Sequence, residues 1–402
     1  MKFFITDDDM CTTQKLNLAR VQKWIESNGG NIVDNADVAD HILCMTCNGW
    51  SLLEENSYSR INKYKKNYAD KMIVVGCVND AHPEKVKKIW SGRTVRTRSD
   101  EDFSFSEIQG LFPNFSKKIK EIPAQSVFRR KEDYRDYNLS KRFINIAEGC
   151  AFNCTFCTHK PGLGNRRSRT LNDILTQIDE CVAEGVKIVN LMGMETSMWG
   201  IEFKLDYADL FQSVINFSNS YEIHMAQFNA HGFDRYAKKL LPLLKNPRVT
   251  DIQAPIQSTS NRILKMMKRR LHSEGLGDFF REVKKFNKRV VLRTDLIIGW
   301  PTETPEERIE SLKFAGEIFD EIALYSIELS PDLPAWKYID DAYSASELSQ
   351  IHKDSLEYLK SNFPDVVVHS GQQDDATMAN IESQRQKLRM SKQSFTIESS
   401  TK

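Results

Sequence analysis

Short apolar runs alternate with segments of helical spacing along most of this 402-residue chain. After residue 142 the apolar runs recur at intervals typical of βα units. These strand candidates are residues 143–147, 187–192, 222–228, 249–255, 290–298 and 322–329. Helical segments such as 171–184 and 305–319 separate them. Strands that alternate with helices form parallel sheets, so this α/β pattern predicts a partial, TIM-like (β/α)6 barrel.

The first part of the chain repeats the alternation on a smaller scale. Strand candidates at 2–6, 39–45 and 72–75 are separated by helical segments at 12–27 and 52–68. The first of these helical segments stops at Asn-Gly-Gly, a common helix end. The pattern predicts an N-terminal doubly wound domain with a parallel sheet.

Composition divides the chain into five regions. We expect a first domain over 1–122, a charged linker over 123–141 and the barrel over 142–336. A helical and strand extension follows over 337–369. Residues 370–402 are rich in Gln, Ser, Asp and Lys, and such a segment buries too little apolar surface to offset its ordering entropy. The last region is therefore predicted to be a disordered tail.

The charge balance bears on partners and location. Lys and Arg number 56 and Asp and Glu 55, for a net charge of +1, which argues against a dedicated nucleic-acid binder. No apolar run reaches the roughly 20 residues of a membrane span. The N-terminus turns acidic early and does not resemble a signal peptide. We expect a cytoplasmic monomer, in which eight cysteines indicate metal binding or catalysis rather than disulfides.

Three cysteines lie in one eight-residue window: Cys150, Cys154 and Cys157, called here the compact triad. Three thiolates on one loop can hold three irons of a 4Fe–4S cluster and leave the fourth iron open to a ligand with an amine and a carboxylate. A zinc knuckle, with His159 as a nominal fourth ligand, and three unrelated core cysteines are the alternatives.

Three further cysteines are spread over the first 80 residues: Cys11, Cys47 and Cys77, the dispersed triad. Each follows a predicted strand of the N-terminal domain. Ligand sites in open parallel sheets gather at the carboxyl ends of the strands, so the three loops can converge on a second metal centre. The alternative is that they are inert buried cysteines, which are common.

The spacing Cys-x3-Cys-x2-Cys, with the aromatic Phe156 before the last cysteine, resembles the radical S-adenosylmethionine (SAM) signature. The resemblance implies that SAM binds the open iron and is cleaved to methionine and a 5′-deoxyadenosyl radical, which abstracts hydrogen from an unactivated carbon. It also implies an external electron donor of the flavodoxin or ferredoxin type. The cofactors carry out the radical chemistry, and the protein binds and orients them.

Several ordered segments over residues 1–335 resemble the methylthiotransferase branch of these enzymes. They are Thr46-Cys47, Gly76-Cys77, residues 191–200, 255–260, 264–269 and 294–304. The resemblance implies a second 4Fe–4S cluster on the dispersed triad that carries or donates sulfur, with further SAM as methyl donor. Radical capture by that sulfur would form a carbon–sulfur bond.

The resemblance also implies which residues contact SAM. These are Phe156, Gly193, Glu195, Asn229, Gln257 and Ile298. Met194 occupies the position of a usually polar residue, so Glu195 is the expected substitute for the amine contact. Thr259 and Thr302 stand where the family has glycine, and Met10-Cys11-Thr12-Thr13-Gln14 replaces Gly-Cys-x-x-Asn.

Other residues carry weaker signals. Arg166 and Arg167 are candidates for anionic substrate groups, with a solvated basic turn as the alternative. His231, beyond the third barrel strand like Asn229, suits a structural role as well as a catalytic one. Cys44 and Cys181 are expected to be core residues.

These patterns leave three classes of function open. Residues 337–402 lack the Gly-rich alternating strands of the family's RNA-binding barrel. The leading prediction is therefore carbon–sulfur bond formation on a small, nucleoside-like metabolite or a peptide. The second is methylthiolation of a tRNA adenosine or a ribosomal-protein side chain, and the third is a non-catalytic iron–sulfur electron-transfer or sensor protein.

Overall fold

A computed structural model describes residues 1–6, 10–49, 51–98, 105–129, 141–269 and 275–370 of the chain. The described residues form two compact units. Unit 1 contains residues 1–129, 142–151 and 157–169. Unit 2 contains residues 141, 152–156 and 170–370. Most of the predicted linker and all of the predicted tail beyond residue 370 lie outside the described residues.

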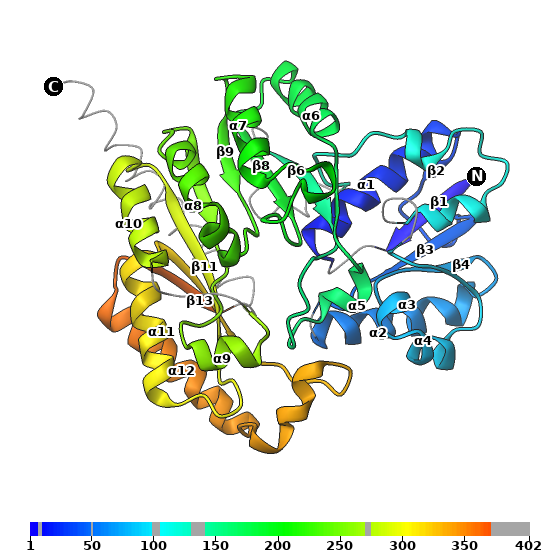
Figure 1. Cartoon of the computed structure of the whole chain (residues 1–402). Helices are drawn as coiled ribbons and strands as arrows, with labels where there is room; N and C mark the ends of the chain where they lie inside the picture. Colours follow the sequence, from blue (N-terminus) through cyan, green and yellow to red (C-terminus); the bar gives the residue numbers. More distant parts are fainter. Residues whose placement is uncertain (7–9, 50, 99–104, 130–140, 270–274, 371–402) are drawn as a thin grey trace. The chain divides into compact units, whose positions relative to one another are not determined.

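Unit 1 is built on a five-stranded sheet in the order β2-β1-β3-β4-β5, with every neighbouring pair parallel (Figure 1). Its strands are β1 (Lys2–Thr6), β2 (Asn31–Ile32), β3 (His41–Thr46), β4 (Met72–Gly76) and β5 (Arg93–Val95). Its helices are α1 (Thr12–Ser27), α2 (Ser51–Tyr68), α3 (Val78–Ala81) and α4 (Pro83–Ile89). The parallel-sheet prediction for this part of the chain is confirmed.

Alternation along each strand gives this sheet two hydrophobic cores. In β3, Leu43 and Met45 pack into one core together with Trp24 of α1. Ile42 of the same strand packs into the other core together with Ile61 of α2. Successive strand side chains point to opposite faces, so a sheet covered on both faces has nearly continuous apolar strands.

Unit 1 also contains a short antiparallel pair and a helix. Strand β6 (Lys141–Glu148), with its residues from 142 onward in this unit, pairs antiparallel with β7 (Arg167–Ser168). Helix α5 (His159–Leu163) lies between them in the sequence. The alternative interpretation of the basic run at 166–169 as a solvated turn is wrong, because two of its residues form a strand.

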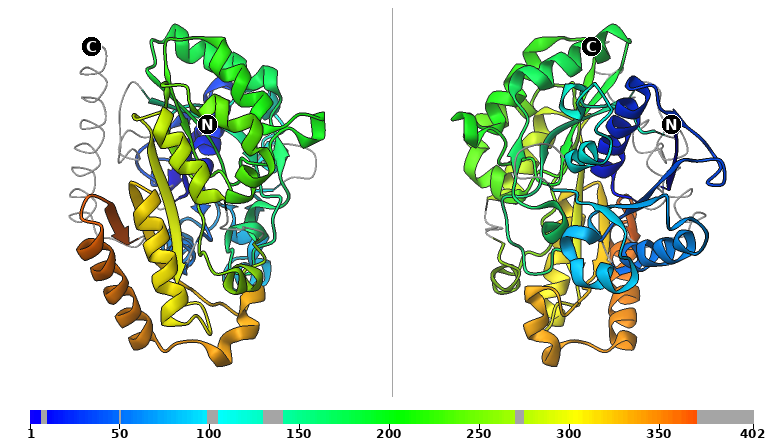
Figure 2. Two further views of the ribbon diagram at one scale, coloured as in Figure 1. Left: turned by 60° about the vertical axis from the view of Figure 1, so that its left-hand side comes forward. Right: turned by 90° about the vertical axis from the view of Figure 1, so that its right-hand side faces the viewer.

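Unit 2 carries six parallel strands in the order β13-β12-β11-β10-β9-β8. They are β8 (Ile188–Gly193), β9 (Glu222–Met225), β10 (Val249–Gln253), β11 (Val291–Ile298), β12 (Glu321–Ser326) and β13 (Val367–Ser370). The helices are α6 (Leu171–Ala183), α7 (Tyr207–Phe217), α8 (Ala230–Leu244), α9 (Asn261–Met266), α10 (Leu276–Phe286), α11 (Pro305–Ile318) and α12 (Ala345–Asn362). Helices α11 and α12 pack against β11 and β12, on the outer side of the strands (Figure 2).

The final βα unit extends this sheet. Helix α12 leads into β13, which pairs parallel with β12 through Ile322 and Val368. Val367 and Val368 are buried. The sequence interpretation placed this segment in an extension after the barrel, whereas its backbone bonds continue the same sheet. None of the described helices is long and apolar enough to cross a membrane.

Candidate cluster and SAM sites

The dispersed triad follows three neighbouring strands of unit 1. Thr46 and Gly76 are register partners at the ends of β3 and β4, so Cys47 and Cys77 leave the sheet side by side. Cys11 follows β1, the other neighbour of β3, and immediately precedes α1. The tertiary structure therefore brings together three cysteines that are 66 residues apart at their extremes, at the carboxyl edge of the sheet.

The three sulfurs interact directly. Hydrogen bonds from Cys11 and Cys77 hold the pKa of the Cys47 thiol well below its ordinary value. The same bonds, together with burial, raise the pKa of the Cys11 and Cys77 thiols. Backbone N–H groups of Thr13 and Gln14 at the start of α1 also point at the Cys11 sulfur. A thiolate is thus favoured at the centre of the triad, and thiolates are the form that binds metal.

The donor set suits an iron–sulfur cluster. Cys47 and Cys77 are buried and Cys11 is half-buried, and soft thiolates are the ligands of such clusters. Gly76 is required beside them, since its φ is +119° and a Cβ there would lie 2.4 Å from the Thr46 carbonyl oxygen. Among the described residues, no three His, Cys, Asp or Glu side chains surround a position for a single metal ion.

The compact triad is divided between the two units. Cys150 and Cys157 belong to unit 1 and Cys154 to unit 2, and all three are half-buried. Burial raises the pKa of the Cys157 thiol, but a hydrogen bond and positive charge from His159 bring it below the ordinary value. In unit 2, Arg269 Nη1 lies 3.9 Å from the Cys154 sulfur while its Nη2 donates to the Pro255 carbonyl at 2.6 Å.

The SAM candidates of unit 2 follow four adjacent strands. Gly193 ends β8, and Asn229 precedes α8 beyond β9, where its Oδ1 accepts from the His231 N–H at 3.1 Å. Gln257 lies beyond β10 and is held by backbone bonds to β11. Ile298 ends β11. These residues share one edge of the sheet, the edge at which barrel enzymes bind their ligands.

Glu195, the predicted substitute for the amine contact, is held by a buried hydrogen bond. Glu195 is 2% exposed and its Oε1 accepts a hydrogen bond from Ser197 Oγ. Met194 beside it is half-buried. The ring of Phe156 meets Trp300 edge-on, with centroids 6.1 Å apart. The structure places all of these side chains in unit 2.

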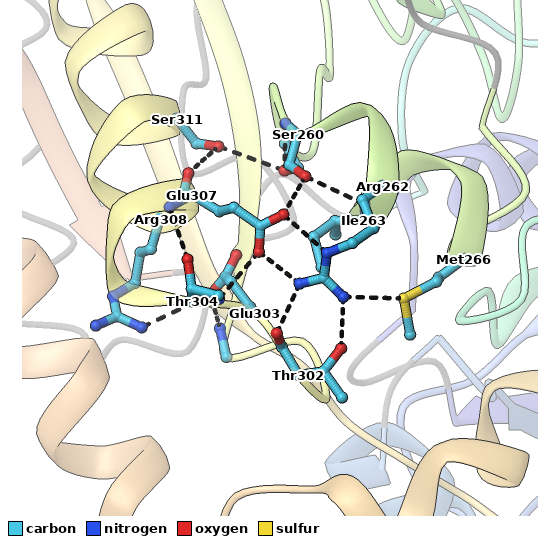
Figure 3. A network of polar contacts seen from close by, with 12 residues as sticks. Ser260, Arg262, Ile263, Met266, Thr302, Glu303, Thr304, Glu307, Arg308 and Ser311 are labelled. Carbon is cyan, nitrogen blue, oxygen red and sulfur yellow. Dashed lines mark hydrogen bonds and ion pairs between the residues drawn. The ribbon is translucent and has the colours of Figure 1, made fainter.

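A polar network ties the loop after β10 to the loop after β11 (Figure 3). Arg262 donates to the Thr302 carbonyl at 2.6 Å and to its hydroxyl at 2.7 Å, and it pairs with Glu307. Ser260 donates to the same carboxylate at 2.7 Å. Thr302 adopts a left-handed φ of +68°, which is unfavourable for a β-branched residue, so these bonds hold a strained turn. Sequence reasoning marked Thr302 but missed Arg262.

The remaining candidates have structural partners. Arg166, which immediately precedes β7, donates to the hydroxyl of Ser168 in that strand, and Arg167 is the register partner of Glu148. Cys44 is fully buried in a core of unit 1, where burial raises the pKa of its thiol to about 11. Cys181 is buried in α6, so both cysteines lie where a core residue is expected.

The face of the unit 2 sheet that carries Asn190, His224 and Asp251 is polar. These residues are register partners on β8, β9 and β10, and all are buried. Arg293 on β11 pairs with Asp251 at 2.6 Å. Burial raises the pKa of the nearby Asp295 carboxyl to about 6 despite the charge of Arg293. Hydrophobic periodicity did not reveal this polar face, because buried parallel strands read as continuous apolar runs.

Two family models match the chain. Residues 144–315, which contain the compact triad, match the radical SAM superfamily. Residues 10–95, which contain the dispersed triad, match a family described as uncharacterized protein family UPF0004. The two matches therefore divide the six cysteines in the same way as the sequence did.

Relatives with named activities share this organisation. The ribosomal protein uS12 methylthiotransferase RimO of Thermosipho melanesiensis is 25% identical over 325 residues, covering 78% of this chain and 73% of the relative. The tRNA-2-methylthio-N(6)-dimethylallyladenosine synthase of Aquifex aeolicus is 26% identical over 349 residues, covering 83% and 78%.

Solved structures agree at the level of fold. TsrM of Kitasatospora setae, a radical SAM methyltransferase with cobalamin and a 4Fe–4S cluster, superposes with a TM-score of 0.62 at 13% identity. That match covers 83% of this chain and 76% of TsrM. The cobalamin-dependent radical SAM enzyme OxsB gives 0.53 at 14% identity, over 87% and 56%. With its radical SAM and UPF0004 regions and its methylthiotransferase relatives, this chain is similar to the radical SAM methylthiotransferases, whose members bind two 4Fe–4S clusters and SAM.

Proposed function

We propose that this chain forms a carbon–sulfur bond on its substrate, with one 4Fe–4S cluster on the compact triad and a second on the dispersed triad. The observation that carries the proposal is the convergence of Cys11, Cys47 and Cys77 at one sheet edge, with interacting sulfurs, in the region matched by UPF0004. Three thiols in this arrangement can hold a cluster that serves as the source of sulfur.

The chain's residues have separate tasks in this proposal. When bound, the cluster on the compact triad supplies the electron that cleaves SAM, and the second cluster supplies sulfur. Glu195 and Asn229 hold SAM at the carboxyl edge of the unit 2 sheet, supported by Ser197 and by the turn at Gln257. Electrons come from a flavodoxin- or ferredoxin-type donor to a monomeric cytoplasmic enzyme.

For the substrate we propose a small, nucleoside-like metabolite or a peptide. Support comes from the charge balance, since +1 leaves almost no excess positive charge to neutralise an RNA backbone. Arg166 and Arg167 are the proposed contacts for a single anionic group. The second candidate is a tRNA adenosine or a ribosomal-protein side chain, and the names of the relatives favour it.

Product analysis tests the reaction. Anaerobically reconstituted protein is incubated with SAM, reductant, sulfide and candidate metabolites, peptides or tRNA, and the products are identified by mass spectrometry. A mass gain of sulfur or of a methylthio group on any substrate supports carbon–sulfur bond formation. SAM cleavage without sulfur in any product, at full loading of both clusters, contradicts it.

Titration with total tRNA separates the two substrate candidates. Binding through phosphates alone weakens steeply by about 200 mM salt, because each contact releases condensed counterions. We expect weak binding that is lost at this salt. Submicromolar affinity that survives it would place tRNA ahead of the small substrate.

A further inference from the structure

The segment after Cys157 is fastened to the loop after β3 within unit 1. Asn48 Nδ2 donates to the Thr158 carbonyl at 2.7 Å, and the Thr158 hydroxyl donates to the Gly49 carbonyl. Helix α5, which begins at His159, packs against α3 (Figure 1). Consequently the last cysteine of the compact triad and the central cysteine of the dispersed triad belong to one hydrogen-bonded structure.

Two glycines show how closely these segments approach. A Cβ on Gly162 would lie 2.7 Å from Asn48 Oδ1 and 2.9 Å from the Cβ of Cys77. A Cβ on Gly49 would lie 3.1 Å from His159 Nε2 and 3.6 Å from the Cys47 sulfur. A side chain at residue 162 would collide with Asn48 and Cys77, and one at residue 49 would press on the His159 ring.

His159 lies at the centre of the contact. Its imidazole hydrogen-bonds the Cys157 sulfur. Its Nε2 and the Cys47 sulfur both lie within 4 Å of the position that a Cβ on Gly49 would occupy. One side chain therefore hydrogen-bonds a ligand of one proposed cluster and lies near a ligand of the other, and the Asn48–Thr158–Gly49 bonds hold its backbone in place.

We propose that His159 is a positioning residue shared by the two triads, which hydrogen-bonds the Cys157 sulfur and faces Cys47, and so fixes these two cluster ligands relative to each other. The inference deepens the proposed function and relies on it for the presence of two clusters. Hydrogen bonds to a cluster sulfur stabilise the reduced, more negative state and are among the groups that set its potential. His159 thus also tunes the cluster on the compact triad.

Redox titration tests the hydrogen bond. The potential of the compact-triad cluster is measured in chains whose dispersed triad is replaced by alanine, so that only one cluster titrates. His159→Leu is expected to shift the potential to a more negative value, and His159→Gln, which keeps a donor, to restore part of the shift. His41→Leu removes a histidine from the opposite end of β3 and is expected to match the parent.

Electron paramagnetic resonance of the two-cluster protein tests the positioning. The reduced parent is expected to show magnetic interaction between its clusters, and His159→Leu and Asn48→Ala to alter it at unchanged iron content. An unchanged potential together with an unchanged spectrum in His159→Leu would overturn the inference. Loss of iron from the compact triad in both His159 variants would also overturn it, in favour of direct ligation. If the variants show these shifts but the parent makes no sulfur product, the proposed function fails and the positioning role stands.

Discussion

Glu303 should make the stability of this protein depend on pH near neutrality. It lies in the loop after β11 and is 2% exposed. Its Oε2 accepts the Gly299 N–H at 2.8 Å, and Arg308 Nη1 lies 3.8 Å away. Burial raises the pKa of the Glu303 carboxyl from 4.5 to about 7, against the opposing effect of these two partners.

The sign and size of the effect follow from linkage. The folded state holds the Glu303 proton more tightly than the unfolded state does, so the stabilisation is complete below pH 4.5 and is lost as the pH rises through 7. A rise from 4.5 to about 7 corresponds to about 3 kcal/mol in the free energy of unfolding. About 2 kcal/mol of this is lost between roughly pH 5.5 and pH 8.

Glu303→Gln removes the titration and keeps an oxygen for the Gly299 N–H. Urea unfolding under anaerobic conditions at several pH values in this window measures the effect. The wild type is expected to lose about 2 kcal/mol more than the variant. Glu306→Gln, at an exposed carboxyl in the next helix, is the control and should follow the wild type. Parallel pH profiles for wild type and Glu303→Gln would refute the reasoning.

Three further predictions concern the two triads and the strained turn. Alanine at all three compact-triad positions should abolish SAM cleavage and leave about four irons per chain; undiminished 5′-deoxyadenosine would contradict the radical SAM site. Alanine at the dispersed triad should lower the iron content from about eight to about four, keep SAM cleavage and end sulfur transfer; equal iron in variant and wild type would exclude a second cluster. Thr302→Gly relieves about 1 kcal/mol of left-handed strain but loses the hydroxyl contact with Arg262, so we expect a near-neutral effect. In an Arg262→Ala background the same change should stabilise by about 1 kcal/mol in urea unfolding, and equal effects in both backgrounds would disprove the coupling.

Periodicity was a reliable guide wherever long segments carried it. The predicted helix over 12–27 is α1 with the same bounds, and the predicted strand over 2–6 is β1. Sixteen residues of helical spacing that end at Asn-Gly-Gly specify the helix and its end locally, without help from tertiary contacts. Short elements were missed for the opposite reason. Strands β2 and β7 have two residues each and exist only through their partners.

The two groups of cysteines were likewise visible in the sequence, because three thiols in one window and three after predicted strands are local features. The sequence also assigned the dispersed triad to the N-terminal domain and the compact triad to the barrel. The sequence by itself thus determined the α/β class, the parallel sheets and the cysteines to be tested.

Only the tertiary structure decided how these parts meet. The Asn48–Thr158 bond joins residues 110 positions apart, and Arg262 reaches Thr302 across 40. Strand β13 joins the unit 2 sheet through backbone bonds that no side-chain pattern specifies. Hydrophobic periodicity reports which face of an element is buried, whereas polar contacts between distant segments depend on where the completed fold brings their atoms within hydrogen-bonding distance. His159 is the clearest case: in the sequence it is a nominal zinc ligand beside the compact triad, and in the fold it hydrogen-bonds Cys157 and lies near Cys47.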